Sequence, residues 1–165
     1  MSSDSTELPD LQASFIAAMR RFATTVTIVT VCPNRERSGM TATAVACVST
    51  EPPAVLVCVN RTASIHANME MNTPFCINLL AANHAAVSAA FGGKLGGAAR
   101  FSVGDWDADS KGRAYLKDAQ ANVFCVVDST LTYGTHTVII GKVDAVRMHG
   151  SVAPLLYGDG KYLGV

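Results

Sequence analysis

The sequence lacks an excess of charge of either sign, and it has few charged residues. Its 165 residues include 13 Lys and Arg and 13 Asp and Glu, so the formal net charge is +0. A chain with this balance creates no overall field that attracts nucleic acid or an anionic membrane surface. We therefore expect neither nucleic acid nor membrane among its partners.

Features of a secreted or membrane-spanning protein are also absent from the sequence. The polar start of the chain has neither the basic residues nor the apolar core of a signal peptide. No apolar run reaches the roughly 18 residues that span a bilayer. The five cysteines are an odd number without Cys-x-x-Cys spacing, which indicates buried free thiols in a reducing compartment. Together these absences predict a cytoplasmic protein.

Motifs of several common enzyme classes are missing as well. There is no Gly-x-Gly-x-x-Gly after a strand, no Gly-x-x-x-x-Gly-Lys-Ser/Thr and no Gly-x-Ser-x-Gly. The four histidines do not have the spacing of metal ligands, so no metal is expected. If the chain is an enzyme, a bound cofactor therefore supplies the reactive group while the protein positions it.

The sequence does contain apolar, β-branched runs separated by turn residues. Its length suits one domain, and we expect a flexible tail at residues 1–9 and a single domain at residues 10–165. The runs predict strands at 26–31, from 39 onward, and at 54–59, 75–80, 123–133, 137–146 and 154–157. Since helices do not alternate with these strands, we predict a mainly β fold, an antiparallel barrel with peripheral helices.

Helical spacing is confined to short segments between the strands. Asp10 is placed to cap a first helix. The buried stripe of that helix would consist of Leu11, Phe15, Ala18, Met19 and Phe22. Other helical segments are predicted at 65–69, at 83–91 with Asn83 as the cap, and as one turn at 116–121. Gly141 predicts a bulge, and the irregular region 92–113 is functional or disordered.

Residues 37–53 combine a glycine with small side chains and end at two prolines. Gly39 permits a sharp turn or a close approach, and the Thr and Ala residues after it suit a strand but do not fill a core. Such a strand leaves room beside its backbone, where N–H and C=O groups can meet a flat polar ligand. The alternative is a glycine turn before an ordinary small-residue strand.

A second candidate contact follows the strand predicted at 54–59. Asn60 and Arg61 lead into the start of a predicted helix, and Ser64 is placed to cap it. A helix start beside an arginine favours a phosphate, although an ordinary capped helix with a surface arginine is the alternative. Asn78, the polar residue of the strand at 75–80, is either a hydrogen-bonded core amide or a ligand contact.

The order and spacing of short motifs along nearly the whole chain are more specific than any single motif. They are Phe15-x-x-Ala18-Met19-x-x-Phe22-Ala23, Gly39-Met40-Thr41-Ala42, Val48-Ser49-x-x-Pro52-Pro53, Val59-Asn60-Arg61, Asn78-Leu79-Leu80, Arg100-Phe101 and Gly134-x-His136-x-x-x-Ile140-Gly141. In this order they resemble the short-chain flavin reductases. These are reductase components of two-component flavin-dependent monooxygenases, similar to the reductase of 4-hydroxyphenylacetate 3-monooxygenase.

The resemblance implies an FMN-binding split barrel with antiparallel Greek-key topology, assembled as a homodimer. It implies NAD(P)H:flavin oxidoreductase activity, with hydride transfer from NADH or NADPH to FMN or FAD and delivery of reduced flavin to a partner monooxygenase. A non-catalytic flavin- or haem-binding split-barrel module, a relative of the pyridoxamine-phosphate oxidases and a structural protein are the alternatives. The oxidase requires a denser basic site than this neutral chain offers.

The resemblance also assigns roles to individual residues. Those beside the flavin ring and its ribityl chain are Met40, Thr41, Ala42, Thr43, Ser49 and Thr50. Those at the flavin phosphate are Asn60, Arg61 and Ser64, and those in a loop closing over the flavin are Arg100 and Phe101. Asn78 belongs to the cofactor-binding set as well. Tyr157 and Tyr162 complete this set and border the dinucleotide. The catalytic residue, associated with the nicotinamide, is His136.

The chain departs from the family pattern at one of these motifs. Thr135 stands where the family has Asp, between Gly134 and His136. That acid either tunes the histidine or stabilises the turn. With a threonine in its place, a plain strand-end histidine is the alternative interpretation of His136.

Overall fold

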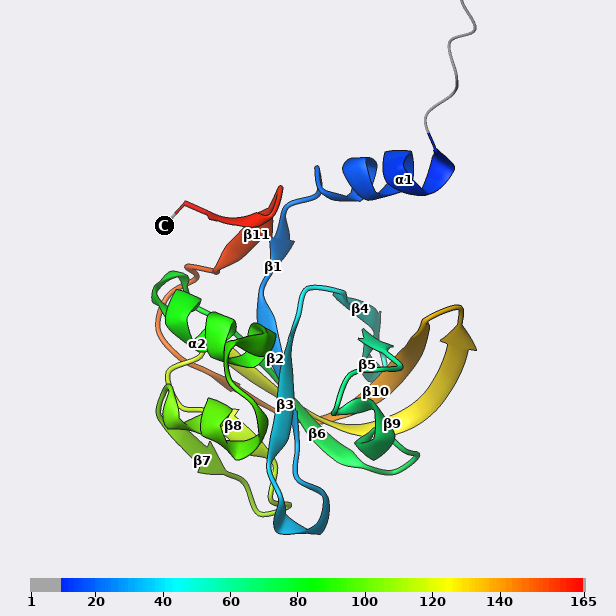
Figure 1. Ribbon diagram of the computed structural model, residues 1–165. Helices are drawn as coiled ribbons and strands as arrows, with labels where there is room; N and C mark the ends of the chain where they lie inside the picture. Colours follow the sequence, from blue (N-terminus) through cyan, green and yellow to red (C-terminus); the bar gives the residue numbers. More distant parts are fainter. Residues whose placement is uncertain (1–9, 165) are drawn as a thin grey trace, which may run out of the picture.

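The computed structural model describes residues 10–164, and its centre is a curved antiparallel sheet of seven strands (Figure 1). In chain order the strands are β2 (Thr27–Val31), β3 (Ser38–Ala42), β4 (Val45–Thr50), β5 (Pro53–Asn60), β6 (Pro74–Leu79), β9 (Ala121–Tyr133) and β10 (His136–Met148). Hydrogen bonds place them in the order β3-β2-β6-β9-β10-β5-β4. The predicted mainly β, antiparallel fold is confirmed, whereas the tail expected at residues 1–9 lies outside the described residues.

The two edge strands of this sheet, β3 and β4, follow one another in the chain. Only Thr43 and Ala44 separate them, so the sheet curls until its two edges approach each other. The Cys58 N–H of β5 donates to the Ala44 carbonyl at 3.0 Å, which ties the link to the far side of the sheet. Within residues 10–164 no ladder of hydrogen bonds joins β3 to β4. The result is a barrel that is open along one line, consistent with a split barrel.

The barrel interior holds the main hydrophobic core. Val29, Val57, Phe75, Val127 and Ile139 are among its buried side chains, and each comes from a different strand. Full burial of such a side chain contributes about 1.5–3 kcal/mol of transfer free energy. The core therefore holds the strands in place around the open line between β3 and β4.

Smaller elements cover the outer face of β2 and β3. They are helix α2 (Ala85–Ala89), the hairpin of β7 (Trp106–Ala108) and β8 (Ala114–Leu116), and the small sheet of β1 (Thr24–Thr25), β11 (Leu156–Gly158) and β12 (Lys161–Leu163). A second core cluster lies beneath them and includes Ile28, Leu80, Phe91 and Leu155. In Figure 1, α2, β7 and β8 lie on one side of β2 and β3, while β9 and β10 curve away on the other.

Several boundaries predicted for the helical segments are wrong. Leu116 ends strand β8 instead of starting a helical turn. The segment predicted at 65–69 is only a 3-10 turn, His66–Asn68. At 82–94 a 3-10 turn, α2 and a π-turn (Ala90–Lys94) follow one another, and Asn83 does not cap α2. Segments this short have little helical stability of their own, so packing against the sheet decides their conformation.

Helix α1 (Leu11–Met19) begins where predicted but does not bury its apolar stripe. Asp10 accepts a hydrogen bond from the Gln12 N–H at 3.2 Å, which confirms the cap. Leu11, Phe15 and Phe22, however, are 84%, 60% and 62% exposed. The expected burial is wrong for the single chain because α1 extends beyond the barrel, as Figure 1 shows.

Gly141 bends β10 as predicted. The pairing of β9 with β10 shifts register between Ile140 and Gly141. A Cβ atom on Gly141 would lie 2.9 Å from Phe75 Cε1 and closer still to Phe75 Cζ. Glycine is required here because the Phe75 ring occupies the space of any side chain.

The five cysteines are free, but they are not all buried as predicted. Cys76 and Cys125 are buried, whereas Cys47 on β4 is exposed. β4 is an edge strand whose outer face meets solvent, so an apolar run in the sequence does not guarantee burial there.

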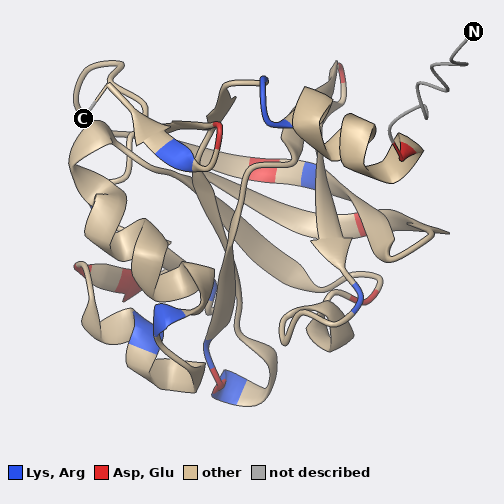
Figure 2. Cartoon of the chain, turned by 45° about the horizontal axis from the view of Figure 1, so that its top comes forward, with Lys and Arg blue, Asp and Glu red and all other residues tan. Residues whose placement is uncertain are grey.

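Charged side chains are dispersed over the surface. Figure 2 shows Lys and Arg at several separate loops and strands and not along one groove, which matches the balanced composition. None of the helices between residues 10 and 164 is long and apolar enough to cross a bilayer.

Candidate functional site

The open line between β3 and β4 is hollowed on several sides. Cavities of about 520, 280 and 360 Å³ all have Thr43 in their walls. Because β3 and β4 are edge strands, each also has a row of backbone N–H and C=O groups outside the sheet ladder. Space beside main-chain donors and acceptors makes the Thr43 region the candidate site.

Strand β3 presents its side chains to two different surroundings. Met40 and Ala42 pack with Val59 and Ala63 in the barrel interior. Thr41 points the other way, and its Oγ1 donates to the Ser88 carbonyl of α2 at 2.7 Å. Of the residues predicted to line a flavin ring, only Thr41 and Thr43 therefore bring side chains to a cavity. The side chains of Met40 and Ala42 belong to the core, so only the main-chain groups of these two residues are open to the predicted flavin contact, which stays a prediction.

Five of the nine residues that line the 280 Å³ cavity carry a hydroxyl group. Thr41 and Thr43 from β3 and the β3–β4 link meet Tyr157 and Tyr162 from the C-terminal hairpin there. The two tyrosine rings are edge to face, with centroids 5.6 Å apart. Tyr162 Oη lies 2.9 Å from Ser88 Oγ, which fixes that hydroxyl at the cavity wall. The structure thus brings together four of the predicted residues that are far apart in the sequence.

Three further residues of this cavity were missed by the sequence reasoning. They are Ser88 on α2, and Gly92 and Lys94 on the π-turn that follows it. The glycine-rich run at 92–97 was the available signal, but without the spacing of a phosphate-binding loop it pointed to no ligand. Ser88 carried no signal because its role comes from the placement of α2 beside β3.

A second group of predicted residues meets at the end of β5. His136 and Asn60 are directly opposite each other on β10 and β5. The Arg61 N–H donates to the Thr135 carbonyl at 3.0 Å, and Asn60 Oδ1 accepts from the Thr62 N–H and hydroxyl, each at 2.9 Å. Ser64 is exposed in the same turn. Because only a 3-10 turn follows, the expected helix start does not contribute to a phosphate site.

His136 is oriented by its neighbour in the chain. Thr135 Oγ1 lies 2.9 Å from His136 Nδ1, and the imidazole is otherwise exposed at the start of β10. The threonine thus contacts the ring as a neutral hydroxyl, where a carboxylate would bring a negative charge. His136 stands with Asn60 and Arg61, and among the residues that the structure describes no hydrogen bond or strand pairing joins it to Tyr157 or Tyr162.

Arg100 and Phe101 hold a loop in place instead of facing a cavity. They belong to the 3-10 turn Gly97–Ser102. Arg100 Nε donates to the Leu95 carbonyl at 2.8 Å and Nη1 to the Gly39 carbonyl at 2.5 Å. Phe101 is buried and packs against Phe91, with ring centroids 5.0 Å apart. In the structure both residues support the segment beside β3, and their contact with a flavin stays a prediction.

Three other predicted residues lie away from the cavities at Thr43. Asn78 is fully buried, donates from Nδ2 to the Ile28 carbonyl at 3.0 Å and accepts at Oδ1 from the Leu116 N–H at 2.9 Å. It is the core amide of the two readings, and its prediction as a ligand contact is corrected. Ser49 Oγ accepts from the Glu51 N–H at 3.1 Å at the far end of β4, and Thr50 beside it is exposed.

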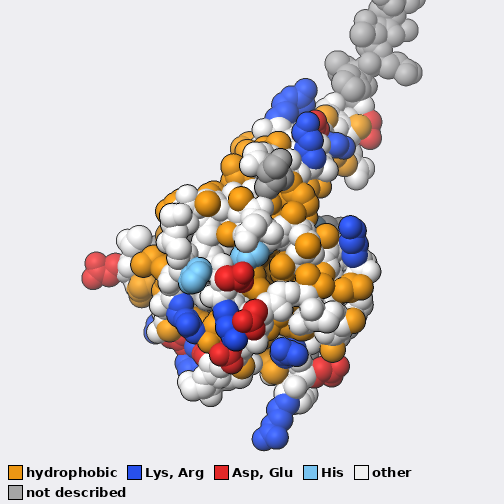
Figure 3. All heavy atoms as spheres, turned by 90° about the vertical axis from the view of Figure 1, so that its left-hand side faces the viewer, with side chains coloured by type: hydrophobic (Ala, Val, Ile, Leu, Met, Phe, Trp, Pro, Cys, Tyr) orange, Lys and Arg blue, Asp and Glu red, His pale blue; other side chains and the backbone are white. Residues whose placement is uncertain are grey.

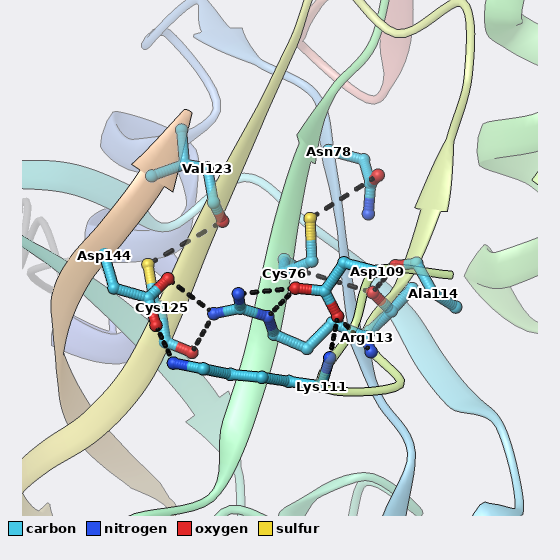
Figure 4. Close-up of polar contacts among 10 residues, drawn as sticks. Cys76, Asn78, Asp109, Lys111, Arg113, Ala114, Val123, Cys125 and Asp144 are labelled. Atoms are coloured by element: carbon cyan, nitrogen blue, oxygen red, sulfur yellow. Dashed lines mark hydrogen bonds and ion pairs between the residues drawn. The ribbon is translucent and has the colours of Figure 1, made fainter. Parts of the chain in front are cut away.

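A buried ion-pair cluster outside the site carries the clearest pKa shifts (Figure 4). Arg113 is 3% exposed and bonds to Asp109 and to Asp144, the latter at 2.7 Å. Burial alone would raise the pKa of both carboxyls, but hydrogen bonds from Arg113 and Lys111 hold each pKa below its usual value. Nearby, burial raises the pKa of the Cys125 thiol to about 12, so it is no nucleophile. The cluster ties the β7–β8 hairpin to β10.

The chemistry available at Thr43 is binding and positioning. The main-chain N–H and C=O groups of the edge strands and the hydroxyl groups in the cavity wall suit a planar polar ring. Lys94, the charged residue of the 280 Å³ cavity, suits a phosphate.

A family model described as flavin reductase like domain matches residues 19–165 of the chain. The chain is 39% identical over 151 residues to the reductase component of the FADH(2)-dependent resorcinol hydroxylase of Rhizobium sp. (strain MTP-10005), across 90% of this chain and 84% of that protein. It is 38% identical over 151 residues to the FMN reductase (NADH) RutF of Variovorax paradoxus (strain S110), across 92% and 84%.

Solved structures give the same result. The Streptomyces globisporus C-1027 NADH:FAD oxidoreductase SgcE6, in complex with NAD and FAD fragments, superposes with a TM-score of 0.86. The two chains are 26% identical, and the match covers 96% of each.

Proposed function

This chain belongs to the flavin reductase like domain family and is an NAD(P)H-dependent flavin reductase, and from this premise we propose the details of its reaction. It transfers a hydride from NADH to FMN or FAD, and the reduced flavin leaves for a partner monooxygenase. Two relatives support this proposal, one named as the reductase component of a resorcinol hydroxylase and one as an FMN reductase (NADH).

The observation that carries the proposal is the open line between β3 and β4, with its three cavities at Thr43. An edge strand lined by small residues offers N–H and C=O groups to the rim of a flat ring at the spacing of a strand. Small side chains at this point leave the ring face open to a second ring. A barrel closed by a β3–β4 ladder would have neither the free groups nor the space.

The residues of the chain act by holding reactants and not by acid or base chemistry. When bound, the flavin supplies the hydride-accepting ring, so the protein needs no strong acid or base for that step. The main chain of residues 40–43 holds the ring, and its N–H groups stabilise negative charge that develops there. Thr41 and Thr43 supply hydroxyl contacts. Placing both rings in contact accounts for most of the acceleration.

The second group of residues completes this assignment. Arg61, with Asn60 and Ser64, binds the flavin phosphate, and His136 contacts the nicotinamide. Arg61 is exposed, and one exposed cation gives an affinity low enough for reduced flavin to leave.

The reaction is tested by mixing the purified protein with NADH and either FMN or FAD and following absorbance at the nicotinamide band. We expect NADH oxidation that depends on added flavin, because the protein provides the sites and the flavin the chemistry. Flavin binding without NADH oxidation would point to a non-catalytic flavin-binding module, and absence of both would reject the proposal.

Residue roles are tested by two variants with matched controls. Arg61→Ala should raise the KM for flavin about tenfold, the value of one charge-assisted phosphate contact, with the KM for NADH unchanged. His136→Ala should raise the KM for NADH and leave flavin titration unchanged. Lys142→Ala and His149→Ala, both exposed on or beside β10, are the controls. If His136→Ala changes flavin binding and not NADH kinetics, its assignment is wrong.

A homodimer is the proposed assembly. Apolar side chains of α1 are exposed in the single chain, and Figure 3 shows hydrophobic side chains continuing from the base of α1 onto the body of the molecule. The 520 Å³ cavity at this junction is lined by Phe15, Ile16, Met19 and Phe22 together with residues 157–160. A second copy of the chain would cover this surface and complete the cavity wall.

A further inference from the structure

The corner that joins β9 to β10 is a two-residue turn, made of Gly134 and Thr135. Tyr133 and His136, on either side of it, face each other in the strand pairing. Gly134 has φ +55, whereas the φ of Thr135 is not positive. A hairpin turn of this kind requires glycine at its first central position and places no such requirement on the second. The turn therefore does not account for the threonine side chain.

The main chain around Thr135 is held from the neighbouring strand. The N–H of Arg61, directly after β5, donates to the Thr135 carbonyl at 3.0 Å. His136 is paired on both sides, with Asn60 of β5 and with Tyr133 of β9. The backbone at both residues is thus fixed, so the side chains of Thr135 and His136 are held close together.

The side chain of Thr135 contacts the ring of His136. Its Oγ1 lies 2.9 Å from Nδ1 of the imidazole. A threonine hydroxyl can donate one proton as well as accept, and within residues 10–164 this hydroxyl has no other hydrogen-bond partner. Its proton is therefore free to be donated to Nδ1. A neutral imidazole that accepts at Nδ1 carries its own proton on Nε2.

The second ring nitrogen of His136 is open to a ligand. The imidazole is exposed, and in the described part of the chain Nε2 has no hydrogen-bond partner. No side chain there competes for the Nε2 proton. The ring therefore presents an N–H group to a molecule that binds beside Asn60 and Arg61.

We propose that Thr135 is a positioning residue that makes His136 a hydrogen-bond donor, through Nε2–H, to the carboxamide oxygen of the nicotinamide. The inference rests on the proposed function, which assigns His136 to the nicotinamide. A carboxylate at position 135 could only accept a hydrogen bond. It would draw the ring proton to Nδ1 and leave Nε2 as an acceptor. Thr135 thus decides whether the histidine can bond to the oxygen or to the amide group of the carboxamide.

The position of the ring proton can be measured by nitrogen NMR of isotope-labelled protein at alkaline pH, where a histidine side chain is neutral. The chain has four histidines, and the signals that vanish in His136→Ala identify this one. We expect the proton on Nε2 in the parent chain and in Thr135→Ser, which keeps the hydroxyl. In Thr135→Asp we expect it on Nδ1. Thr130→Val, at an exposed threonine of β9, is the control and should leave the parent pattern unchanged.

Steady-state kinetics test whether the Nε2 proton reaches the nicotinamide. Thr135→Asp should raise the KM for NADH about tenfold, the value of one hydrogen bond, because Nε2 would face the carboxamide oxygen without a proton. The kcat and the KM for flavin should stay unchanged, because the lost contact is made equally before and during hydride transfer. Thr135→Ser should behave as the parent chain. The rise should persist at high salt, where repulsion by the new carboxylate would be screened.

The two measurements separate this inference from the proposed function. A protein that oxidises no NADH would reject the nicotinamide contact, while the nitrogen spectra would still show whether Thr135 sets the proton position. A proton on Nδ1 in the parent chain would overturn the inference, as would the same proton position in the parent chain and Thr135→Asp. An unchanged KM for NADH in Thr135→Asp, or a rise that high salt removes, would overturn the contact with the nicotinamide.

Discussion

Gly141 shows how one residue shapes the longest strand pair of the molecule. The Phe75 ring occupies the place of its side chain, and the register of β9 and β10 shifts beside it. Gly141→Ala should therefore destabilise the fold by about 1–3 kcal/mol, the usual cost of overpacking a core. Urea unfolding measures the loss.

The matched control for this prediction is Gly96→Ala. A Cβ atom at Gly96 has nothing within 4 Å, and its φ of −102° suits any residue. Its stability should stay within about 0.5 kcal/mol of the parent chain. Equal effects of the two substitutions would contradict the packing argument.

Single-residue roles were the hardest to predict from the sequence. The bulge at Gly141 could be predicted because a glycine inside a strand usually marks a bulge, a bend or a close approach of another group. Asn78 and Arg100 could not be assigned, because an amide or a guanidinium suits a ligand and a backbone carbonyl equally well. Only the fold shows that the carbonyls of Ile28 and Gly39 take these donors.

Among the elements, the β7–β8 hairpin depends on the buried Arg113 cluster. Asp109 and Asp144 have pKa values below the usual value in the folded chain. A carboxyl of this kind adds stability above its unfolded pKa, and the gain is lost as pH falls through its folded pKa. The free energy of unfolding should therefore fall as pH drops below about 4.

Asp109→Asn tests this contribution. At neutral pH the variant should lose about 1–3 kcal/mol, since a hydrogen bond to a buried charge is removed, and its acid dependence should be shallower. Asp105→Asn, which breaks an exposed pair with Lys117, is the control and should change stability by less than about 1 kcal/mol. Thermal unfolding from pH 3 to 7 gives both curves. Parallel curves for Asp109→Asn and the parent chain would refute the linkage.

Strands were predicted better than helices. β-Branched runs between turn residues located the strands of the barrel because that pattern is local. The turns at 65–69 and 116–121 were misjudged, since their conformation follows from contacts with β10 and β6. His66, for example, is held by Thr137 of β10 at 2.9 Å.

At the scale of the whole molecule, exposed α1 predicts association between copies of the chain. Light scattering after size exclusion should give a dimer at micromolar concentration. Phe15→Glu places a charge in the proposed interface and should raise the dimer dissociation constant by about tenfold or more. Met71→Glu is the control, because Met71 is an exposed methionine that lies outside α1, between the 3-10 turn His66–Asn68 and β6.

Two outcomes would contradict the dimer prediction in different ways. A monomeric parent chain would reject the assembly itself. A dimer that Phe15→Glu leaves intact would show that another surface makes the contact. The sequence alone could not predict the outcome, because an apolar stripe on a helix has the same pattern whether it packs within its own chain or against a second copy.

The short link of Thr43 and Ala44 has one more consequence. It leaves the open line between β3 and β4, where strand pairing stops. A ligand bound along this line would accept or donate the hydrogen bonds that a β3–β4 ladder would otherwise make. We therefore expect a flavin bound there to raise the free energy of unfolding, and the flavin-free protein to unfold more readily. Release of reduced flavin should therefore also lower the stability of the barrel beside β3 and β4.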